Sequence, residues 1–550
     1  MVFLSTLLIS MFITMALIPI LRMAAVRLHA GLDLPEPRKV HSAPVPKVGG
    51  LAMAVGALVP VILVADGGRF VNSVLIGACV IVLFGLVDDL KTLGWKAKFA
   101  GQIAAALIVI LYGQLNVCYL GSCLPEGVRL PDMLALPITL VVIVGVTNAI
   151  NLSDGLDGLA GGTSLLIFLS IALLCYTGGD FPEKLVVMLL CTAVVGAIFG
   201  FLRFNTYPAT VFMGDTGSQL LGFLAITLSI GITQRETPVS PLLPVLLLGF
   251  PVLDTLTVMA ERLAAGRPPF APDKNHFHHK LMRLGLFHTE AVVAIYGITA
   301  ILTGAAFVLR FHSEWLIIAI YAGFCGSVIG FFTLAEQHSL RFHRTGFFDT
   351  GIKARLKFIK DKSLLIRACF LPLQYGLPLL FAAAVLVRET VPGYLAAVAA
   401  GFAAAILMVR VLRWQWVNPV LRVAFYLTVP MVLSLGRIEP AEWVTKALLT
   451  VYDYAYGALA LFTVLTLKFT RRKKGFKATP MDFLILVIAL VVPNLPERFI
   501  GEVHMGFVAV KLMVLYFGFE VLTGELRGEL RKIALGMLAA LALLAVRGVV

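Results

Sequence analysis

Long apolar runs, separated by short polar segments, alternate along the whole chain. Most of them contain about 17 to 25 residues, which is the length that crosses the hydrocarbon layer of a bilayer. Backbone groups find no water within lipid, so runs of this length must form helices or closed barrels. They are too long and too continuously apolar for barrel strands. The pattern therefore predicts an all-α protein, a polytopic transmembrane helical bundle.

About eleven of these runs precede residue 336, and about seven follow residue 362. The first set is predicted at 2–21, 49–66, 71–87, 99–116, 133–150, 161–177, 185–202, 217–233, 240–260, 291–309 and 315–335. The second set is predicted at 364–387, 392–409, 420–436, 441–467, 480–493, 505–523 and 532–549. We therefore expect a membrane domain at 1–335, a basic cytoplasmic linker at 336–362 and a C-terminal transmembrane region at 363–550, for which the sequence indicates no function.

The composition is that of a membrane protein, and the distribution of Lys and Arg among the loops indicates its orientation in the membrane. The chain is 59% hydrophobic and 14% charged, with a net charge of +14, whereas a soluble domain carries about a quarter charged residues. The loops between the first eleven runs hold fourteen Lys and Arg residues on one side and five on the other. This bias places the basic side in the cytoplasm. We expect a multi-pass protein of a bacterial inner membrane, with no nucleic-acid partner.

The seven cysteines lie mostly within apolar runs, where they act as small hydrophobic residues. Cys118 and Cys123 share a loop predicted to lie outside, where a disulfide and two free thiols are equally compatible with the sequence. No Cys or His spacing typical of a zinc site is present in the sequence.

Two acidic clusters lie on the predicted cytoplasmic side. Asp88 and Asp89 end the third run, and adjacent carboxylates repel each other unless a cation or basic group lies between them. Asp154 and Asp157 lie in a glycine-rich loop that follows Asn151, and a helical turn would place both acids on one face. The alternative for Asp88 and Asp89 is a solvated helix end, and the alternative for Asp154 and Asp157 is a helix N-cap. The acids favour a metal or phosphate-transfer site, and the glycines favour a loop that holds a ligand.

Two further polar segments are predicted on the same side. One segment contains Asn205, whose amide could bind the polar edge of a base, and Phe212, whose ring could stack on a base. It ends with Asp215, an acid just before an apolar helix. The alternatives are a turn role for Asn205, a packing role for Phe212 and an N-cap role for Asp215. The loop 261–290 is rich in basic and histidine side chains. These are Arg262, Arg267, Lys274, His276, His278, His279, Lys280 and Arg283. Histidines surrounded by Lys and Arg side chains are better suited to binding a polyphosphate than to binding zinc. The alternative is a solvated basic loop without a ligand.

Together these segments resemble the polyprenyl-phosphate N-acetylhexosamine-1-phosphate transferases of glycosyltransferase family 4, relatives of the phospho-MurNAc-pentapeptide translocase. The resemblance covers roughly residues 1–335. Its motifs are Pro46–Gly50, Gly85–Asp89 followed by Lys98 and Gln102, Asn148–Gly162, Phe212–Ser218 and His276–His279. The resemblance implies transfer of a sugar 1-phosphate from a UDP-sugar to undecaprenyl phosphate, with release of UMP.

The resemblance also implies roles for individual residues. Asp88, Asp89 and Asp157 would be catalytic, with Asp88 and Asp89 at the reacting phosphate as ligands first and as a base second. Asp215 and Asp88 would bind Mg²⁺, or Mn²⁺ in its place. Substrate binding would fall to Lys47, Lys98, Asn151, Asp154, Asn205, Phe212, Arg267, His276, His278 and His279, with Asn205 and Phe212 at the uracil. UDP-N-acetylhexosamine, undecaprenyl phosphate and membrane lipids would be the partners, and a homodimer is compatible with the sequence.

The branch of the family is also indicated. His276-Phe277-His278-His279 differs from the three consecutive histidines of the peptidoglycan branch and resembles the N-acetylhexosamine branch that initiates O-antigen, enterobacterial common antigen and teichoic acid. The sugar expected is GlcNAc, in the first step of a cell-envelope glycan. Lys91 lies one residue earlier than its counterpart in the peptidoglycan branch, so we transfer no role to it. A lipid-linked sugar transporter or flippase and a non-catalytic scaffold are the rival readings, but acids at helix ends on one face favour an enzyme.

Overall fold

The computed structural model describes residues 2–338 except 34–43, 66, 126–127, 180, 235–236 and 269–274. Beyond residue 362 it describes 363–388, 390–412, 417–434, 441, 443–469, 531–548 and several residues of 511–522. The described residues form two compact units, one within 1–343 and the other within 344–550. Most of the predicted linker, 339–362, lies outside the described residues, and so does the predicted span 480–493.

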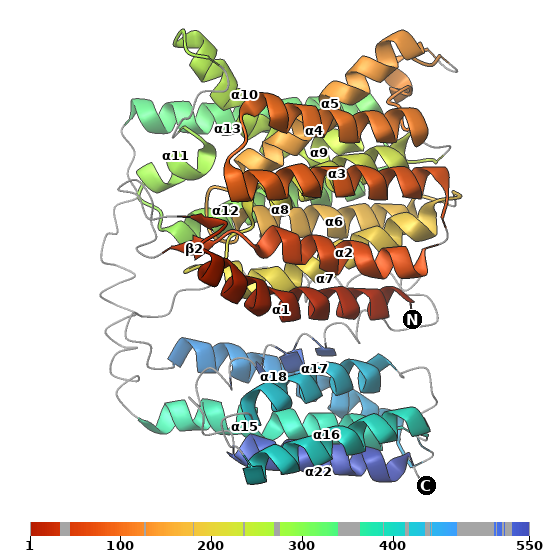
Figure 1. The fold of residues 1–550 in the computed structure, drawn as a ribbon, viewed down its shortest axis with the longest axis vertical. Helices are drawn as coiled ribbons and strands as arrows, with labels where there is room; N and C mark the ends of the chain where they lie inside the picture. Colours follow the sequence, from red (N-terminus) through yellow and green to blue (C-terminus); the bar gives the residue numbers. More distant parts are fainter. Residues whose placement is uncertain are drawn as a thin grey trace. The chain divides into compact units, whose positions relative to one another are not determined.

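Helices make up nearly all the regular structure of the first unit (Figure 1). They are α1 (Val2–Leu28), α2 (Gly49–Val64), α3 (Arg69–Lys91), α4 (Trp95–Leu107, continued by a π turn at Ile108–Tyr112), α5 (Asp132–Leu152), α6 (Leu159–Thr177), α7 (Lys184–Asn205), α8 (Gly214–Thr233), α9 (Leu243–Leu247), α10 (Gly249–Ala264), α11 (Phe277–Arg283), α12 (His288–Val308) and α13 (Glu314–Gln337). Two short strands, β1 (Leu32–Asp33) and β2 (Val45–Pro46), pair antiparallel. In the part of the chain that the structure describes, ten helices are long and apolar enough to cross a membrane. The prediction of a polytopic all-α bundle is confirmed.

Helix α8 forms the core of the first unit. Every residue from Thr216 to Thr233 is buried, and the helix packs against α2, α3, α5 and α6. A helix that is surrounded by other helices can be apolar on all sides. By contrast, α1 and α13 expose most of their apolar side chains, as expected of helices that face lipid. The burial gradient therefore runs from the lipid-facing helices α1 and α13 inward to α8.

The ninth predicted span, 240–260, is not one helix in the structure. It consists of α9 and α10, which meet at Leu248. Pro251 explains much of the break, because its nitrogen carries no hydrogen and cannot donate to the carbonyl of Leu247. The loop 261–290 also differs from the prediction, since it contains the short helix α11.

At the end of the first unit that holds the C-terminus of α8, two side chains form hydrogen bonds with one loop. The Gln234 side chain accepts from the backbone N–H groups of Cys118 and Tyr119 and donates to the Tyr119 carbonyl. The Glu314 carboxylate, at the start of α13, accepts from the backbone N–H and the hydroxyl of Ser122. These two side chains tie the segment between α4 and α5 to the rest of the bundle.

Cys118 and Cys123 are free thiols in this segment. Both are partly exposed, and burial raises the pKa of each thiol above its usual value. Of the two alternatives that the sequence left open, the structure has the pair of thiols.

The second unit is a separate helical bundle. Its described helices include α15 (Ser363–Leu386), α16 (Gly393–Leu412), α17 (Val417–Ser434), α18 (Lys446–Phe469) and α22 (Arg531–Arg547). Helix α15 packs against α18 and α22, while α16 packs against α17 and α22. These helices match five of the seven spans predicted beyond residue 362, and most of a sixth span, 505–523, lies outside the described residues.

Candidate active site

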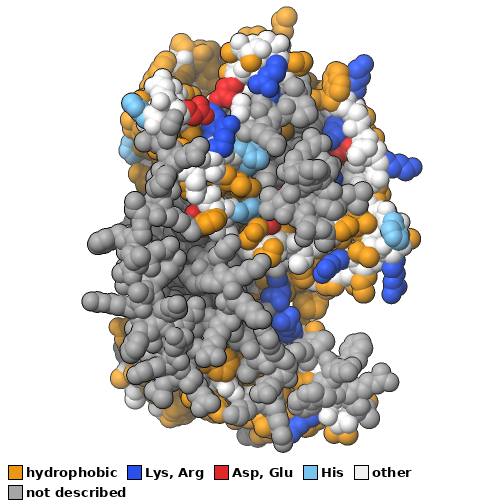
Figure 2. All heavy atoms as spheres, turned by 90° about the vertical axis from the view of Figure 1, so that its left-hand side faces the viewer, with side chains coloured by type: hydrophobic (Ala, Val, Ile, Leu, Met, Phe, Trp, Pro, Cys, Tyr) orange, Lys and Arg blue, Asp and Glu red, His pale blue; other side chains and the backbone are white. Residues whose placement is uncertain are grey.

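The loops between α1 and α2, α5 and α6, α7 and α8, and α10 and α12 meet at one end of the first unit. Backbone hydrogen bonds join the α7–α8 loop to the α1–α2 loop: the Phe212 N–H donates to the Pro46 carbonyl at 2.9 Å, and the Gly49 N–H donates to the Phe212 carbonyl at 3.0 Å. Within the α1–α2 loop, the Lys47 N–H donates to the Gly31 carbonyl at 2.8 Å. Figure 2 shows this end, where histidine, acidic and basic side chains gather between hydrophobic ones. The polar segments singled out in the sequence therefore share one face of the bundle.

Asp89 caps the N-terminus of α8. Its Oδ1 accepts from the Asp215 N–H at 2.9 Å, and its Oδ2 accepts from the N–H and hydroxyl of Thr216 at 3.0 and 2.6 Å. Gly214 makes this approach possible, because its φ is +69° and a Cβ there would lie 2.5 Å from the Asp89 carboxylate. Gly85, one turn before Asp89, lets α3 touch the backbone of Thr216. Asp89 thus orients the helix end on which Asp215 stands.

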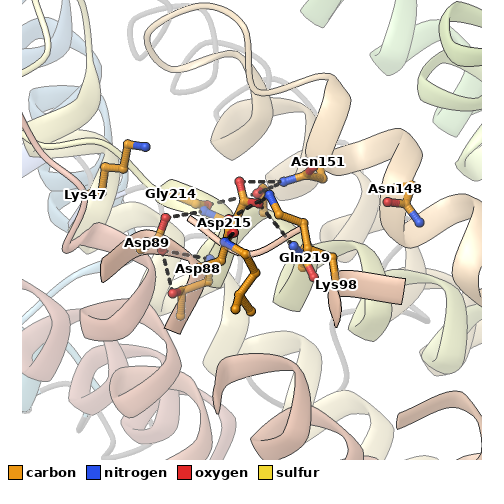
Figure 3. A network of polar contacts seen from close by, with 12 residues as sticks. Lys47, Asp88, Asp89, Lys98, Asn148, Asn151, Gly214, Asp215 and Gln219 are labelled. Atoms are coloured by element: carbon orange, nitrogen blue, oxygen red, sulfur yellow. Dashed lines mark hydrogen bonds and ion pairs between the residues drawn. The ribbon is translucent and has the colours of Figure 1, made fainter. Parts of the chain in front are cut away.

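Asp88 and Asp215 share one lysine. Lys98 Nζ lies 2.7 Å from Asp88 Oδ2 and 2.6 Å from Asp215 Oδ2. Figure 3 shows this network of polar contacts. Asn151 donates to the other oxygen of Asp215 at 3.2 Å. The Lys98 and Asp215 side chains are 32% and 26% exposed, so a solute reaches this group from one side. Carboxylates from two helices are held around one cation, which offsets their mutual repulsion.

Amide side chains continue this group into the bundle. Gln219, one turn after Asp215 on α8, donates to its carboxylate at 3.4 Å. Gln102 donates to Gln219 at 3.2 Å and accepts from Asn148 at 2.6 Å. Sequence reasoning assigned no role to Asn148 or Gln219. The signal was present, since a buried amide in an apolar helix needs hydrogen-bond partners.

The residues present fit a divalent cation with oxygen ligands. Asp88 and Asp215 already hold a cation, the Lys98 ammonium, between them. Mg²⁺ usually takes one or two carboxylates and fills its other positions with water and substrate phosphates. Within the described residues no group of three His, Cys, Asp or Glu side chains surrounds a common point. Asp89 is less suited to metal binding, because both its oxygens accept from α8.

The loop between α5 and α6 is fixed to the loop before α8. Asp157 Oδ2 accepts from the Ala209 N–H at 2.9 Å. The buried Asn205 accepts from the Gly158 N–H at 2.9 Å and donates to the Val211 carbonyl at 3.0 Å. Asn205 therefore joins the two loops from within, while its contact with uracil stays a prediction.

Asp154 differs from Asp157 in its electrostatics. Burial raises the pKa of the Asp154 carboxyl to about 7, and the negative charges of Asp215, Asp157 and Asp89 act in the same direction. This carboxyl therefore changes its charge near neutral pH.

The histidines are positioned by an acid that sequence reasoning missed. Asp254, buried in α10, accepts at Oδ1 from the Phe277 N–H at 2.7 Å, and its Oδ2 lies 2.9 Å from His276 Nδ1. The His276 and His278 rings stack with their centres 5.7 Å apart. Asp254 and His278 line a small pocket together with Ser153. A lone acid in an apolar run was the available signal, but the run has the composition of one uninterrupted span, in which Asp254 has no predicted partner.

His278 lies against the glycine-rich loop. A Cβ at Gly155 would lie 2.4 Å from His278 Nε2. Burial, together with His279 and His276, lowers the pKa of His278 to about 3, so this ring is neutral near pH 7. The acidic loop and the histidine helix α11 are therefore in contact.

The other predicted binding residues lie around these groups. Lys47 Nζ is 3.7 Å from Asp33 on β1. Phe212 is partly buried just before α8, and His279 is partly buried beside His278. Arg267 is exposed just after α10, where its N–H donates to the Arg262 carbonyl. Among the predicted residues, one connected group is formed by Asp88, Asp89, Lys98, Asn151 and Asp215. The catalytic, metal-binding and substrate-binding roles of all the predicted residues stay predictions.

Known proteins are similar to this chain. The family model described as glycosyl transferase family 4 matches residues 71–233. A probable undecaprenyl-phosphate N-acetylglucosaminyl 1-phosphate transferase of Bacillus subtilis is 37% identical over 312 residues, which are 56% of this chain and 85% of the relative.

Two further relatives agree with this match. A decaprenyl-phosphate N-acetylglucosaminephosphotransferase of Mycolicibacterium smegmatis is 37% identical over 305 residues, 50% of this chain and 74% of that protein. An undecaprenyl-phosphate alpha-N-acetylglucosaminyl 1-phosphate transferase of Escherichia coli is 29% identical over 298 residues, 53% of this chain and 80% of that protein.

Proposed function

Because this chain belongs to glycosyl transferase family 4 and is a multi-pass membrane transferase of sugar phosphate to a polyprenyl phosphate, we propose that its donor is UDP-GlcNAc and its acceptor undecaprenyl phosphate. The products would be undecaprenyl-diphosphate-GlcNAc and UMP. The step would initiate a cell-envelope glycan of the O-antigen, enterobacterial common antigen or teichoic acid kind. The N-acetylglucosaminyl names of the relatives support the choice of sugar.

One observation carries the proposal. Carboxylates from α3 and α8 meet around the Lys98 ammonium at the partly exposed end of the most buried helix. Two anionic substrates must approach each other in this reaction, so the site needs cations at the point where their phosphates meet. The basic and histidine side chains at the same end add to that requirement.

The proposed reaction is a phosphoryl transfer. An oxygen of the lipid phosphate forms a bond to the phosphorus that carries the sugar, and the bond from this phosphorus to the bridging oxygen breaks. The electron pair of that bond leaves with UMP. The second pKa of a phosphate monoester is near 6, so the lipid nucleophile is largely a dianion at neutral pH. A general base would add little, which favours positioning roles for the carboxylates.

Each residue then has a task. Asp88 and Asp215 would hold Mg²⁺, or Mn²⁺, which would neutralise diphosphate charge and polarise the phosphorus when bound. Lys98 would move from the carboxylates to a phosphate oxygen as substrate enters. Asp89 keeps the N-terminus of α8 aimed at the site. Asp154 and Asp157 would line the nucleotide pocket, and the neutral His278 would donate or accept a hydrogen bond there.

The orientation follows the charge pattern. The site end of the first unit carries the loops with the excess of Lys and Arg, which supports a site that faces the cytoplasm of a bacterial inner membrane. UDP-sugars are made in the cytoplasm, so this orientation gives the donor direct access.

UMP release tests the proposal. Membranes that contain the protein are incubated with UDP-GlcNAc, undecaprenyl phosphate and Mg²⁺, with Asp215→Asn as the inactive comparison. We expect lipid-dependent and metal-dependent UMP release from the wild type and a loss of at least about 1000-fold in the variant. Release only with another UDP-N-acetylhexosamine would correct the sugar. Absence of release across a panel of UDP-sugars, from folded protein, would overturn the proposal.

A further inference from the structure

The second unit contains a buried guanidinium group that pairs with no carboxylate among the described residues. Arg388, two residues beyond the end of α15, is 8% exposed. Its Nε donates to the Ala384 carbonyl and its Nη2 to the Leu433 carbonyl, each at 3.2 Å. Its Nη1 is buried and has no acceptor among the described residues. A buried charge in this situation costs free energy unless an anion accompanies it.

A second guanidinium lies at the same end of this unit. Arg547, in the last turn of α22, donates through Nη1 to the carbonyls of Val385 and Leu386, both at 2.9 Å. The end of α15 therefore brings Arg388 and Arg547 together. Its exposed carbonyls offset part of their charge, because the C-terminus of a helix is partly negative.

A lysine and two tyrosines complete the cluster. Lys511 Nζ lies 4.5 Å from the ring centre of Tyr452 and 5.3 Å from that of Tyr456, and it pairs with Asp453 at 2.5 Å. The hydroxyls of Tyr452 and Tyr456 are 2.8 Å apart. Both tyrosine side chains lie within electrostatic range of the Arg388 guanidinium. Burial lowers the pKa of Arg388 to about 10, so it remains a cation at neutral pH.

We propose that this end of the second unit binds a phosphate group, with Arg388 and Lys511 as its cations and the hydrogen-bonded Tyr452–Tyr456 pair as the source of one hydroxyl donor. A guanidinium matches the oxygens of a phosphate with two parallel N–H groups, and the phenol O–H that the tyrosine pair leaves free donates to a remaining oxygen. The cluster has three cations, Arg388, Arg547 and Lys511, and the one described carboxylate, Asp453, is shared with Lys511. A phosphate would supply the missing counter-charge.

The surroundings favour a phosphate that is carried by a lipid. Leu386, Tyr394 and Val546, close in sequence to the cluster, are apolar or aromatic side chains that are 40%, 61% and 61% exposed. A hydrocarbon chain would cover them when the headgroup is bound. Undecaprenyl phosphate is the lipid chosen for the test, and this choice rests on the proposed function. The phosphate site itself does not depend on it.

Equilibrium binding to the full-length protein tests the site. The protein is placed in phosphatidylcholine nanodiscs and titrated with radiolabelled undecaprenyl phosphate. We expect two equivalents per chain, one at the transfer site and one in the second unit. Arg388→Gln and Lys511→Gln should each weaken the second equivalent by roughly tenfold or more, the effect of losing one charged hydrogen bond. The transfer rate should not change.

A matched variant controls for charge alone. Arg410→Gln removes a cation from the last turn of α16. The first residue of this 20-residue helix, Gly393, lies near Gly548 and hence near Arg547. The two ends of such a helix lie about 30 Å apart, so Arg410 is far from the cluster. The Arg410→Gln variant should still bind two equivalents of undecaprenyl phosphate per chain. If Arg388→Gln fails to fold because two helix ends lose a donor, Arg388→Lys and Lys511→Gln decide the matter. Arg388→Lys keeps the charge but not the paired N–H groups, so it should have an intermediate effect.

Competition distinguishes the two sources of phosphate. Displacement of the second equivalent by millimolar inorganic phosphate would identify the phosphate alone as the ligand, and displacement by unlabelled lipid only would identify the lipid. A single equivalent in an active wild type, or a second equivalent that neither substitution weakens, would overturn the site. Two equivalents without any transfer activity would instead overturn the proposed function and leave this site standing.

Discussion

The two ends of the first unit use polar side chains in opposite ways. At the end with Gln234 and Glu314, side chains accept from and donate to the backbone of one loop, and their hydrogen bonds leave little for a ligand. At the other end, Asp88 and Asp215 share the single cation Lys98, which is partly exposed. The difference teaches that polar residues at a helix end become a candidate site when they form accessible ion pairs in which a charged substrate can replace one partner.

The largest expected effect lies in the shared-cation group. Asp88→Asn should lower the transfer rate by roughly 1000-fold, because Lys98 then pairs with Asp215 alone and one of the two proposed Mg²⁺ ligands is lost. The Mg²⁺ concentration for half-maximal UMP release should rise at the same time. A loss of rate with unchanged Mg²⁺ dependence, which eases as the pH rises, would instead indicate that Asp88 is a base.

A smaller effect is expected from the acid behind the histidines. If His276 binds the substrate as proposed, Asp254→Asn should lower the rate by on the order of 100-fold, since it would displace His276 from the geometry that the reaction needs. The effect should fall mainly on kcat, and Asp254→Glu should restore part of it. A variant that melts many degrees lower, with a normal rate per folded molecule, would show that Asp254 serves the fold alone.

Asp154 should reveal itself through pH. Its pKa of about 7 in the folded chain lies above the usual value of 3.8, so the folded state holds the proton more tightly than the unfolded chain does. Its contribution to the free energy of unfolding is therefore greatest below about pH 4 and is lost as the pH rises through about 7. Melting temperatures from pH 5 to 8 should fall more steeply for the wild type than for Asp154→Asn. Parallel curves would contradict the assignment.

The smallest effect on activity belongs to the opposite end. Gln234→Ala leaves three backbone groups without a partner and should lower the free energy of unfolding by about 1–3 kcal/mol. The transfer rate per folded molecule should stay within about twofold, because the site lies at the far end of α8. A rate loss comparable with that of Asp254→Asn would mean that the two ends are coupled.

Much of the fold was predictable because hydrophobic length determines membrane helices. The spans at α3, α5 to α8, α12 and α13 follow directly from apolar runs. The break between α9 and α10 was missed, since an apolar run that contains Pro251 still has the composition of a single span. Helix α11 was missed because basic and histidine residues carry little helical periodicity over seven residues.

The candidate site was predictable in its residue types but not in its contacts. Asp88, Asp89 and Asp215 were identified from position and resemblance, yet their unequal partners were not visible in the sequence. Two adjacent acids cannot be told apart in the sequence, whereas in the structure Asp88 forms an ion pair with Lys98 and Asp89 accepts hydrogen bonds from the backbone of α8. Asp254 and Gln219 required the tertiary packing, because a single polar residue in an apolar helix indicates a partner without identifying it.

Helix α8 is both the most enclosed element of the first unit and the carrier of Asp215. Inserting or deleting one residue near its start would turn the following side chains by about 100°, and the close packing around it would oppose any readjustment. The register of Asp215 is thus tied to the register of the whole core. A change of length in α8 would therefore disturb the fold and the carboxylate in the same event.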